Sequence, residues 1–528
     1  MATHQIKVVF QPFGRTVYVL KGTKIIEAAA QAGLTVNTPC GGAGTCGKCR
    51  VKISDSAEEP SEYDKNFFSN EDLKEGWRLA CQTAVHTETV VNVPENSLLT
   101  SQHKIVIESH TKKSAEILPA VRKLYVELPL PTMEDNMADL LRLEKAIGNF
   151  KTDLLQLRNL PKILRQCNYK GTAVLTDHHL IDFEPGDTTN QCYGVAFDIG
   201  TTTLVGAMIN LCTGSELAVH SQMNPQISFG DDVLSRIKHS SSCAGCLDEL
   251  HNIIKTAVNE MIENLCKQAD ISRESIYEVA VAGNTTMEHL LCGIEPSPLG
   301  EVPFVPAHAR GLIFDAKELG ISINHHGKIY IFPIIGGFVG GDTVAGILVT
   351  NVSEERGISL LIDIGTNGEI VLGKNGRLLA ASTAAGPAFE GARISYGMRA
   401  TTGAIEKIVF DDDLRYSVID NSTALGICGS ALIDLIAEML KAGIISSTGQ
   451  MLGPDQLPEQ LPVALHQRIY QNRDGQTEFL ISQSNQGRKD LRVVLTQRDV
   501  REFQLAIGAI RAGINIMLKI AKVEIKDI

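Results

Sequence analysis

The alternation of hydrophobic and polar positions near the N-terminus indicates a small, separate domain. Residues 5–11 and 15–20 alternate and are rich in β-branched side chains, which is typical of two strands. The next segment has the spacing of a short helix that ends at Gly33. These two strands and this helix, with the cysteine-rich loop that comes next, have the order of a β-grasp module. A last strand ends near Pro94. We therefore expect the first domain to comprise residues 1–94.

The pattern changes twice after this domain. Residues 95–118 are polar and mixed, which suits a linker, and residues 119–190 contain a strand, a Leu-rich helical pattern and a second strand, which predicts a small α/β middle domain. In residues 191–528, apolar strands run directly into glycine turns, and the segments GVAFDIGTTTLVGAMIN and ISLLIDIGTNGEIVLG resemble each other. This resemblance predicts an internal duplication.

One apolar segment, residues 330–349, is long enough to cross a membrane. It contains Pro333, Asp342 and five glycines, so we expect a buried strand, turn and helix there and no membrane span. The N-terminus has no basic stretch followed by an apolar run, which argues against a signal peptide. We expect a cytoplasmic protein whose cysteines lie in a reducing compartment.

Composition refines the fold class and excludes one kind of partner. A chain of 528 residues with 44% hydrophobic residues, 21% charged residues and 46 glycines is typical of a soluble, multidomain α/β protein. The net charge of −12 argues against a nucleic-acid-binding protein, which would present a basic face.

A glycine-rich loop places Cys40, Cys46 and Cys49 close together, and Cys81 follows at a distance. Three ligands on one loop and a remote fourth suit a [2Fe–2S] cluster and lie close to the plant-type ferredoxin spacing. A zinc ribbon prefers two close cysteine pairs, whereas only one is present. Glycines in the loop allow positive φ angles, so that main-chain amides can approach the cluster sulfides. These glycines are Gly41, Gly42, Gly44 and Gly47.

Two other patterns that involve cysteines are weaker. The stretch from Gly42 to Lys48 fits a phosphate loop, but Cys49 stands where a magnesium-binding Ser or Thr is needed, so we reject that interpretation. Cys243 and Cys246 form a C-A-G-C pair in a polar loop, which fits a redox dithiol, but no thioredoxin pattern surrounds them, and we favour a pair without redox function. The remaining cysteines are scattered and are expected to be packing residues.

The duplicated segments each deliver an aspartate, Asp198 or Asp363, to the end of an apolar strand, followed by a glycine and hydroxyl or amide side chains. Such a hairpin can offer main-chain amides and hydroxyls to phosphate oxygens while the aspartate holds hydrated magnesium. One Asp–Gly turn is common hairpin chemistry, but two facing copies could clamp one triphosphate. The candidate phosphate-binding residues are Gly200, Thr201, Thr202, Thr203, Gly365, Thr366 and Asn367.

Three further turns lead into helices. Gly426 and Gly429 precede a helical pattern with Ser430 near its start, which predicts an adenosine-side turn. In residues 281–291, Asn284, Thr285 and Thr286 are candidates to line the cleft, and in residues 336–346, Asp342 is a candidate catalytic, water-positioning carboxylate. Helix capping explains each of these polar residues equally well.

The duplicated turns resemble the ATP-binding fold of acetate and sugar kinases, Hsp70 and actin. Behind a ferredoxin module, the order of DIGTTT, GNTTMEH, GGFVGGDT, DIGTNGE, STAAGPAFEGA and GICGS resembles the reductive activators of corrinoid-dependent methyltransferases, and the likeness covers nearly the whole chain. It implies a one-electron reduction of an inactive Co(II) corrinoid protein to Co(I) with ATP and Mg²⁺. It also implies an upstream low-potential electron donor and a homodimer supported by the middle domain.

Two alternatives remain open at this point. One is a small-molecule kinase with a redox-sensing cluster, and the other is an electron-transfer scaffold that does not hydrolyse ATP. Members of the superfamily end with another glycine-rich adenosine turn after a strand, whereas this chain stops at KVEIKDI, after an expected helix over residues 498–521. That helix is expected to have nothing downstream to pack with, so we expect either an incomplete C-terminal end or weakened nucleotide binding.

Overall fold

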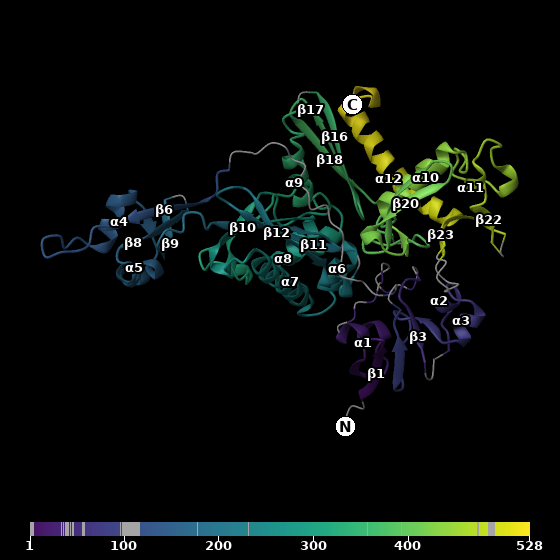
Figure 1. The fold of residues 1–528 in the computed structure, drawn as a ribbon, viewed down its shortest axis with the longest axis horizontal. Helices are drawn as coiled ribbons and strands as arrows, with labels where there is room; N and C mark the ends of the chain where they lie inside the picture. Colours follow the sequence, from purple (N-terminus) through teal and green to yellow (C-terminus); the bar gives the residue numbers. More distant parts are fainter. Residues whose placement is uncertain are drawn as a thin grey trace. The chain divides into compact units, whose positions relative to one another are not determined.

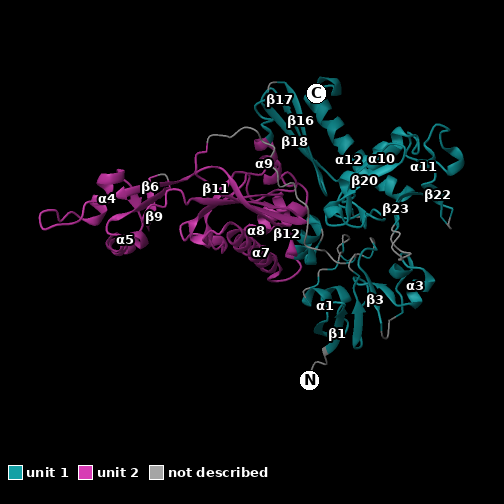
Figure 2. Cartoon of the chain, viewed as in Figure 1, with its two compact units in different colours: residues 1–106, 226–239, 350–528 teal, residues 107–225, 240–349 magenta. Residues whose placement is uncertain are grey.

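The fold is given by a computed structural model, in which the chain forms two compact units (Figure 2). Unit 1 comprises residues 1–106, 226–239 and 350–528, and unit 2 comprises residues 107–225 and 240–349. The structure describes residues 5–32, 34, 36, 38, 42, 44, 47–54, 59–94, 97, 117–176, 178–230, 232–355, 357–391, 393–472, 475–483 and 492–528.

The N-terminal part of unit 1, coloured purple in Figure 1, contains a sheet. It has five strands in the order β2-β1-β5-β3-β4. β1 and β5 are parallel and the other pairs are antiparallel. The elements are β1 Gln5–Gln11, β2 Arg15–Leu20, α1 Ile25–Gln31, β3 Arg50–Ile53, α2 Glu62–Lys65, α3 Asn70–Lys74, β4 Trp77–Leu79 and β5 Thr89–Asn92. The two predicted strands at the N-terminus are confirmed. Alternation sends Val8 and Phe10 into the core, where α1 adds Ile25 and Ala28.

The rest of unit 1 holds three small sheets and the helices packed on them. The strands are β16 Ile358–Ile364, β17 Gly368–Lys374, β18 Arg377–Thr383, β19 Ala404–Phe410, β20 Leu414–Val418, β21 Gly426–Ile427, β22 Ile469–Gln471, β23 Thr477–Gln483 and β24 Arg492–Thr496. The helices are α10 Gly429–Lys441, α11 Val463–His466 and α12 Gln497–Ala521. One hydrophobic core joins them, with Ile370, Ile405, Leu435, Phe479 and Ile510 among its buried members.

Helix α12 packs against β17, β18 and β24. Its buried face contains Ala506, Ile510, Gly513 and Met517, and a Cβ on Gly513 would lie 2.4 Å from the Thr383 side chain. Among the described helices, α12 is the one that is long and apolar enough to cross a membrane, and 28% of its most apolar stretch is buried. Since its inner face belongs to the core, packing on the preceding strands accounts for the apolar residues of that face.

The main sheet of unit 2 has six strands in the order β12-β11-β10-β13-β15-β14. β10, β13 and β15 are parallel, whereas β11, β12 and β14 run antiparallel to their neighbours. The strands are β10 Tyr193–Ile199, β11 Thr203–Asn210, β12 Glu216–Met223, β13 Ile276–Gly283, β14 Leu312–Asp315 and β15 Lys328–Ile331. The helices, with the boundary helix α6, are α6 Val233–Ser240, α7 Cys246–Ala269, α8 Thr285–Cys292 and α9 Gly341–Thr350. β15 and α9 confirm the predicted strand and helix within residues 330–349, but the expected burial is only partial, because Leu348 and Val349 at the end of α9 are exposed.

A second sheet of unit 2 has the order β6-β8-β9-β7 and its own core. Its elements are β6 Val121–Glu127, α4 Asp139–Ile147, β7 Lys151–Thr152, α5 Leu154–Gln166, β8 Lys170–Thr176 and β9 His179–Pro185. Lys123 pairs with Glu184 at 2.7 Å, and the Tyr277 hydroxyl of the main sheet donates to the same carboxylate. The main-chain N–H of Val121 donates to Glu278 at 3.0 Å. Polar contacts therefore tie the two sheets of unit 2 together.

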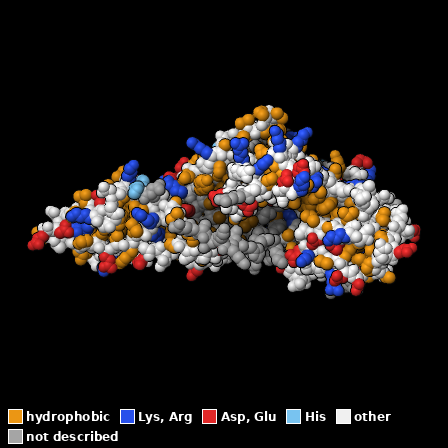
Figure 3. All heavy atoms as spheres, turned by 90° about the horizontal axis from the view of Figure 1, so that it is seen from above, with side chains coloured by type: hydrophobic (Ala, Val, Ile, Leu, Met, Phe, Trp, Pro, Cys, Tyr) orange, Lys and Arg blue, Asp and Glu red, His pale blue; other side chains and the backbone are white. Residues whose placement is uncertain are grey.

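The described surface carries both signs of charge. On the face shown in Figure 3, Lys and Arg side chains are interspersed with Asp and Glu side chains and with hydrophobic groups.

Candidate functional site

The β10–β11 hairpin places Asp198 at the end of a buried strand, next to a short turn. The turn closes through the Gly200 N–H, which donates to the Thr203 carbonyl at 3.0 Å, and a Cβ on Gly200 would lie 2.5 Å from that oxygen. Asn224, a buried residue, braces the turn with two bonds. Its side chain donates to the Gly200 carbonyl at 2.8 Å, and its N–H donates to the Thr202 carbonyl at 2.9 Å. The turn is thus held from both sides.

Asn284 connects this turn to helix α8. Its Oδ1 accepts from the Met287 N–H at 3.0 Å, which caps the helix, while its Nδ2 donates to the Thr201 hydroxyl at 2.8 Å. Asn284 therefore caps α8, which is one of the two roles that the sequence allowed for it. The same side chain also orients a candidate phosphate ligand. Thr285, next along the chain, donates its hydroxyl to the Gly336 carbonyl at 2.7 Å.

Asp342 lies in the first turn of α9, where its Oδ1 accepts from the Thr343 N–H at 2.7 Å. Beside it is Glu288 of α8, which is fully buried; among the described residues its carboxyl oxygens make no hydrogen bond of normal geometry, although the main-chain N–H groups of Gly283 and Gly341 lie near them. A Cβ on Gly341 would lie 2.1 Å from Glu288 Oε1, so the two helix starts approach closely. Burial, and then the charge of Asp342, raises the pKa of Glu288 to about 9. Glu288 is therefore a neutral acid near pH 7, and sequence analysis gave no indication of it.

The β16–β17 hairpin of unit 1 repeats the first turn. Asp363 stands near the end of β16, and the Gly365 N–H donates to the Asn367 carbonyl at 2.9 Å. The Thr366 hydroxyl donates to the carboxylate of Glu390, in the motif STAAGPAFEGA. The two hairpins share the strand, the aspartate and the tight turn, which agrees with the predicted duplication. The sequence did not indicate Glu390 as a partner of this turn, because β18 separates it from the hairpin along the chain.

The third turn lies between β21 and α10. A Cβ on Gly426 would be 2.5 Å from the Tyr396 carbonyl, and one on Gly429 would be 2.2 Å from the Phe389 carbonyl. Because both positions are glycine, the main chain of this turn can pack directly against these two carbonyl groups. The Ser430 hydroxyl donates to the Glu406 carbonyl at 2.7 Å, in the first turn of α10. Packing explains these positions, and their predicted role toward a nucleotide stays a prediction.

Two of the four predicted cluster ligands, Cys40 and Cys46, lie outside the described residues. Cys49 precedes β3 and Cys81 follows β4; both are buried, and both are thiols rather than disulfide partners. The N–H of Ala80 donates to the Cys49 carbonyl at 2.8 Å, so the paired strands bring the two cysteine segments together. Sheet pairing thus explains how a remote fourth cysteine reaches the loop.

Three of the four predicted loop glycines have positive φ angles, and the fourth, Gly41, lies outside the described residues. Gly42, Gly44 and Gly47 have φ angles of +82°, +75° and +66°. A Cβ on Gly47 would lie 2.4 Å from the Phe67 ring, and one on Gly44 would lie 2.8 Å from Tyr63. Buried thiols beside a loop that only glycine can form fit a [2Fe–2S] cluster held by thiolates.

Lys48 stands between this loop and Cys49, and its ammonium binds three main-chain carbonyls of unit 1. The distances from Nζ are 2.8 Å to Ile394, 3.2 Å to Ser395 and 3.2 Å to Gly397. Ser395 in turn donates its N–H to the buried carboxylate of Asp499 at 2.7 Å. The cluster loop is therefore linked to the segment that pairs with β21.

Four domain families match the chain in succession, and together they define an iron–sulfur domain followed by an actin-like nucleotide-binding fold. They are a 2Fe-2S iron-sulfur cluster binding domain over residues 8–86, the RACo linker region over 110–190, the RACo middle region over 193–355, and the C-terminal domain of RACo, the ASKHA domain, over 357–528. The predicted fold class, a ferredoxin-like domain with a fold like that of actin, Hsp70 and sugar kinases, is confirmed.

Individual relatives narrow this class. The corrinoid activation enzyme RamQ of Eubacterium limosum is 31% identical over 516 residues, which is 96% of this chain and 82% of RamQ. A solved structure, the reductive activator for corrinoid, iron–sulfur protein, is 34% identical with a TM-score of 0.70, over 99% of this chain and 85% of that chain. The [Co(II) methylated amine-specific corrinoid protein] reductase of Methanosarcina barkeri is 27% identical over 64% of this chain and 61% of its own length. The chain therefore belongs to the RACo family of corrinoid reductive activators.

Proposed function

We propose that this protein reduces an inactive Co(II) corrinoid protein to Co(I), one electron at a time, with hydrolysis of Mg–ATP. The observation that carries the proposal is that one chain joins a cysteine loop suited to a [2Fe–2S] cluster to a duplicated ASKHA fold. The names of the relatives, a corrinoid activation enzyme and a Co(II) corrinoid protein reductase, support it.

The N-terminal domain would hold the electron-transfer site. We propose that Cys40, Cys46, Cys49 and Cys81 bind the cluster, which supplies a single electron when bound. The chain's own contribution is to bury Cys49 and Cys81 and to shape the loop with left-handed glycines. Burial excludes water from these thiolates, and the loop amides set the polarity around them.

The nucleotide would be held by the two hairpins. We propose that Asp198 and Asp363 act on hydrated Mg²⁺ and that Asp342 positions the attacking water. The phosphate ligands would be Gly200, Thr201, Thr202, Thr203, Gly365, Thr366 and Asn367, and the adenosine side would be held by Gly426, Gly429 and Ser430. The bracing of the first hairpin by Asn224 and Asn284 supports this role, because ligands held in advance cost less to order on binding.

The need for ATP follows from the energetics of the transfer. A plant-type [2Fe–2S] centre has a potential of roughly −400 mV, and Co(I) is a stronger reductant. For one electron, each ~59 mV is a factor of ten in the equilibrium, so a gap of ~240 mV requires a shift of roughly 5.5 kcal/mol. Nucleotide states that differ in affinity for the corrinoid protein supply such a shift.

Assembly and cellular context complete the proposal. We propose a cytoplasmic homodimer that receives electrons from a separate low-potential donor, with the middle domain, residues 119–190, as the contact. Four exposed leucines of α4 and α5 support this contact, since exposed apolar side chains favour association. They are Leu141, Leu154, Leu155 and Leu157.

An anaerobic assay with reconstituted protein, a chemical electron donor and a Co(II) corrinoid protein tests the proposal. The visible spectrum of cobalt should change to that of Co(I) only when ATP is hydrolysed. A phosphorylated small molecule as product would favour the kinase, and equal cobalt reduction with and without ATP would favour the scaffold.

A further inference from the structure

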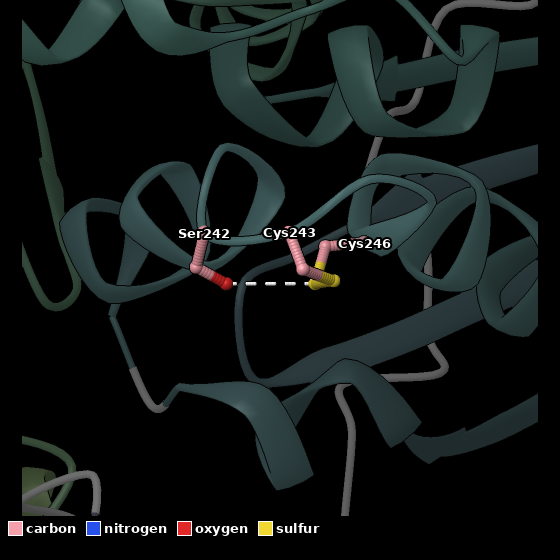
Figure 4. Close-up of a disulfide and its surroundings, with 3 residues drawn as sticks. All are labelled: Ser242, Cys243 and Cys246. Carbon is pink, nitrogen blue, oxygen red and sulfur yellow. Dashed lines mark hydrogen bonds between the residues drawn. A yellow bond between two sulfur atoms is a disulfide. The ribbon is translucent and has the colours of Figure 1, made fainter.

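A disulfide joins Cys243 to Cys246 in unit 2, at the start of helix α7 (Figure 4). Cys243 is exposed, whereas Cys246 is buried as the first residue of the 24-residue helix. Between them, Gly245 takes the left-handed conformation, with φ of 95°, that brings the chain back toward the helix axis. The two sulfurs of one bond thus differ sharply in access to solvent.

The difference in exposure favours nucleophilic attack at Cys243 Sγ rather than at Cys246 Sγ. A nucleophile from solvent can reach the exposed Cys243 Sγ. The other sulfur then leaves as a thiolate in the first turn of α7, where the helix dipole stabilises negative charge and the Glu249 carboxylate, within 4.8 Å of this sulfur, opposes it. The Ser242 hydroxyl lies 3.4 Å from Cys246 Sγ and can donate to it (Figure 4). An accessible sulfur and a stabilised leaving group are the two requirements for rapid exchange.

Other cysteines of unit 2 have a different environment. Burial raises the pKa of Cys192 to about 12 and that of Cys292 to about 12, and it also raises the pKa of Cys266. These thiols are poor nucleophiles because the thiolate form is suppressed. Cys167 is half-buried and Cys212 is exposed, but both are thiols, so Cys243–Cys246 is the one disulfide among the described residues of unit 2. Selective chemistry at Cys243 and Cys246 is therefore expected.

We infer that the Cys243–Cys246 pair is a thiol–disulfide exchange site whose electron donor is a protein dithiol. A donor thiolate attacks Cys243 Sγ, the disulfide breaks, and its electron pair leaves with Cys246 as a thiolate. The second donor thiol then attacks the donor's own sulfur in the mixed disulfide and releases Cys243. Two electrons pass to the pair, two protons from the donor thiols restore both cysteine thiols, and the donor becomes a disulfide. This inference does not rest on the proposed cobalt chemistry.

The pair is placed to influence the nucleotide-binding elements of the same unit. Helix α7 packs against β11, which follows the first phosphate hairpin, and against α8, which begins after Asn284. On the β11 side, a Cβ on Gly206 would lie 3.2 Å from Leu265 of α7. On the α8 side, the His251 ring of α7 lies 3.4 Å from the Leu290 carbonyl. The disulfide ties the loop to the first turn of α7, and its reduction releases that restraint. Amide exchange in the first turn of α7 should therefore differ between the two redox states.

Equilibration of the full chain with mixtures of reduced and oxidised dithiothreitol tests the exchange. After quenching and alkylation, mass spectrometry of the 243–246 peptide gives the ratio of dithiol to disulfide. A tenfold change in the buffer ratio should change this ratio tenfold, as a two-electron exchange requires. Full alkylation at every ratio, or a disulfide that persists at every ratio, would overturn the inference.

A trapping experiment tests the direction of attack. A thioredoxin-type protein that lacks its second cysteine should form a mixed disulfide on Cys243, at least ~10-fold in excess over Cys246. The Cys212→Ser variant, at an exposed cysteine outside the pair, should trap the same product. Trapping mainly on Cys246, or no mixed disulfide at all, would contradict the assignment. The equilibration uses the wild-type chain alone, so misfolding of a variant cannot affect its result.

Discussion

The Asn284 side chain donates to the Thr201 hydroxyl at 2.8 Å while it caps helix α8. One residue thus serves a helix and a candidate phosphate turn that lies 83 positions earlier in the chain. The two roles can be separated, because the cap requires only an oxygen on a short side chain, whereas the contact with Thr201 requires the amide donor.

Asn284→Ala should lower the free energy of unfolding by about 1 kcal/mol through loss of the cap. Asn284→Ser retains a good cap but does not reach Thr201, so its stability should stay close to that of the wild type. Both variants should bind ATP several-fold more weakly. Urea unfolding and ATP titration measure the two effects. Wild-type ATP affinity in Asn284→Ser would show that the contact with Thr201 is irrelevant to binding.

Glu288→Gln should remove a pH-dependent loss of stability. Burial and the charge of Asp342 raise the pKa of Glu288 from 4.5 to about 9. Between these values the folded state keeps a proton that the unfolded state has released. The free energy of unfolding therefore falls as pH rises, by up to about 1.4 kcal/mol per pH unit. Glutamine stays neutral, so the free energy of unfolding of the variant should rise relative to that of the wild type from about pH 5 to pH 9. Below pH 4.5 the two free energies should be equal.

Urea unfolding at several pH values provides the measurement for Glu288→Gln. Glu301→Gln, at an exposed position of the same unit, is the matched control and should show no gain that grows with pH. A difference between Glu288→Gln and wild type that is constant across the range would mean that Glu288 is ionised in the folded protein.

Lys48→Met should loosen the segment that its ammonium binds. Hydrogen bonds from a charged donor to the carbonyls of Ile394, Ser395 and Gly397 are lost, so amide protection around them should fall roughly tenfold. Hydrogen exchange read by mass spectrometry gives the result. The control is Lys52→Met, which removes an exposed ion pair with Glu75 and should leave this segment unchanged. Equal protection in both variants would refute the link.

Gly47→Ala should destabilise the cluster loop more than Gly22→Ala does. Both glycines have positive φ, which costs an alanine about 1 kcal/mol. Only at Gly47 would the new Cβ also meet a ring, 2.4 Å from Phe67, because Gly22 faces open space. Trp77, the one tryptophan of the chain, reports unfolding of this domain by fluorescence, and bound iron can be counted separately. Equal losses of stability in the two variants would mean that the loop shifts to accommodate the new Cβ at Gly47 without a further loss of stability.

Local patterns in the sequence were sufficient to predict the elements that position the site. The strands at residues 5–11 and 15–20 and the two hairpins that follow Asp198 and Asp363 were found because alternation and turn chemistry involve neighbours in the chain. Cysteine spacing likewise predicted a ferredoxin-type domain, and the matching domain family over residues 8–86 confirms it.

Contacts between distant residues were decided by the tertiary structure alone. Asn224 is an ordinary loop residue in the sequence, yet it braces the first phosphate turn. Glu288 reads as one polar position of a helix until the start of α9 covers it, and Lys48 meets a carbonyl 346 positions away. Burial and proximity of this kind depend on which segments pack together, and that packing sets both the proton on Glu288 and the partner of Lys48.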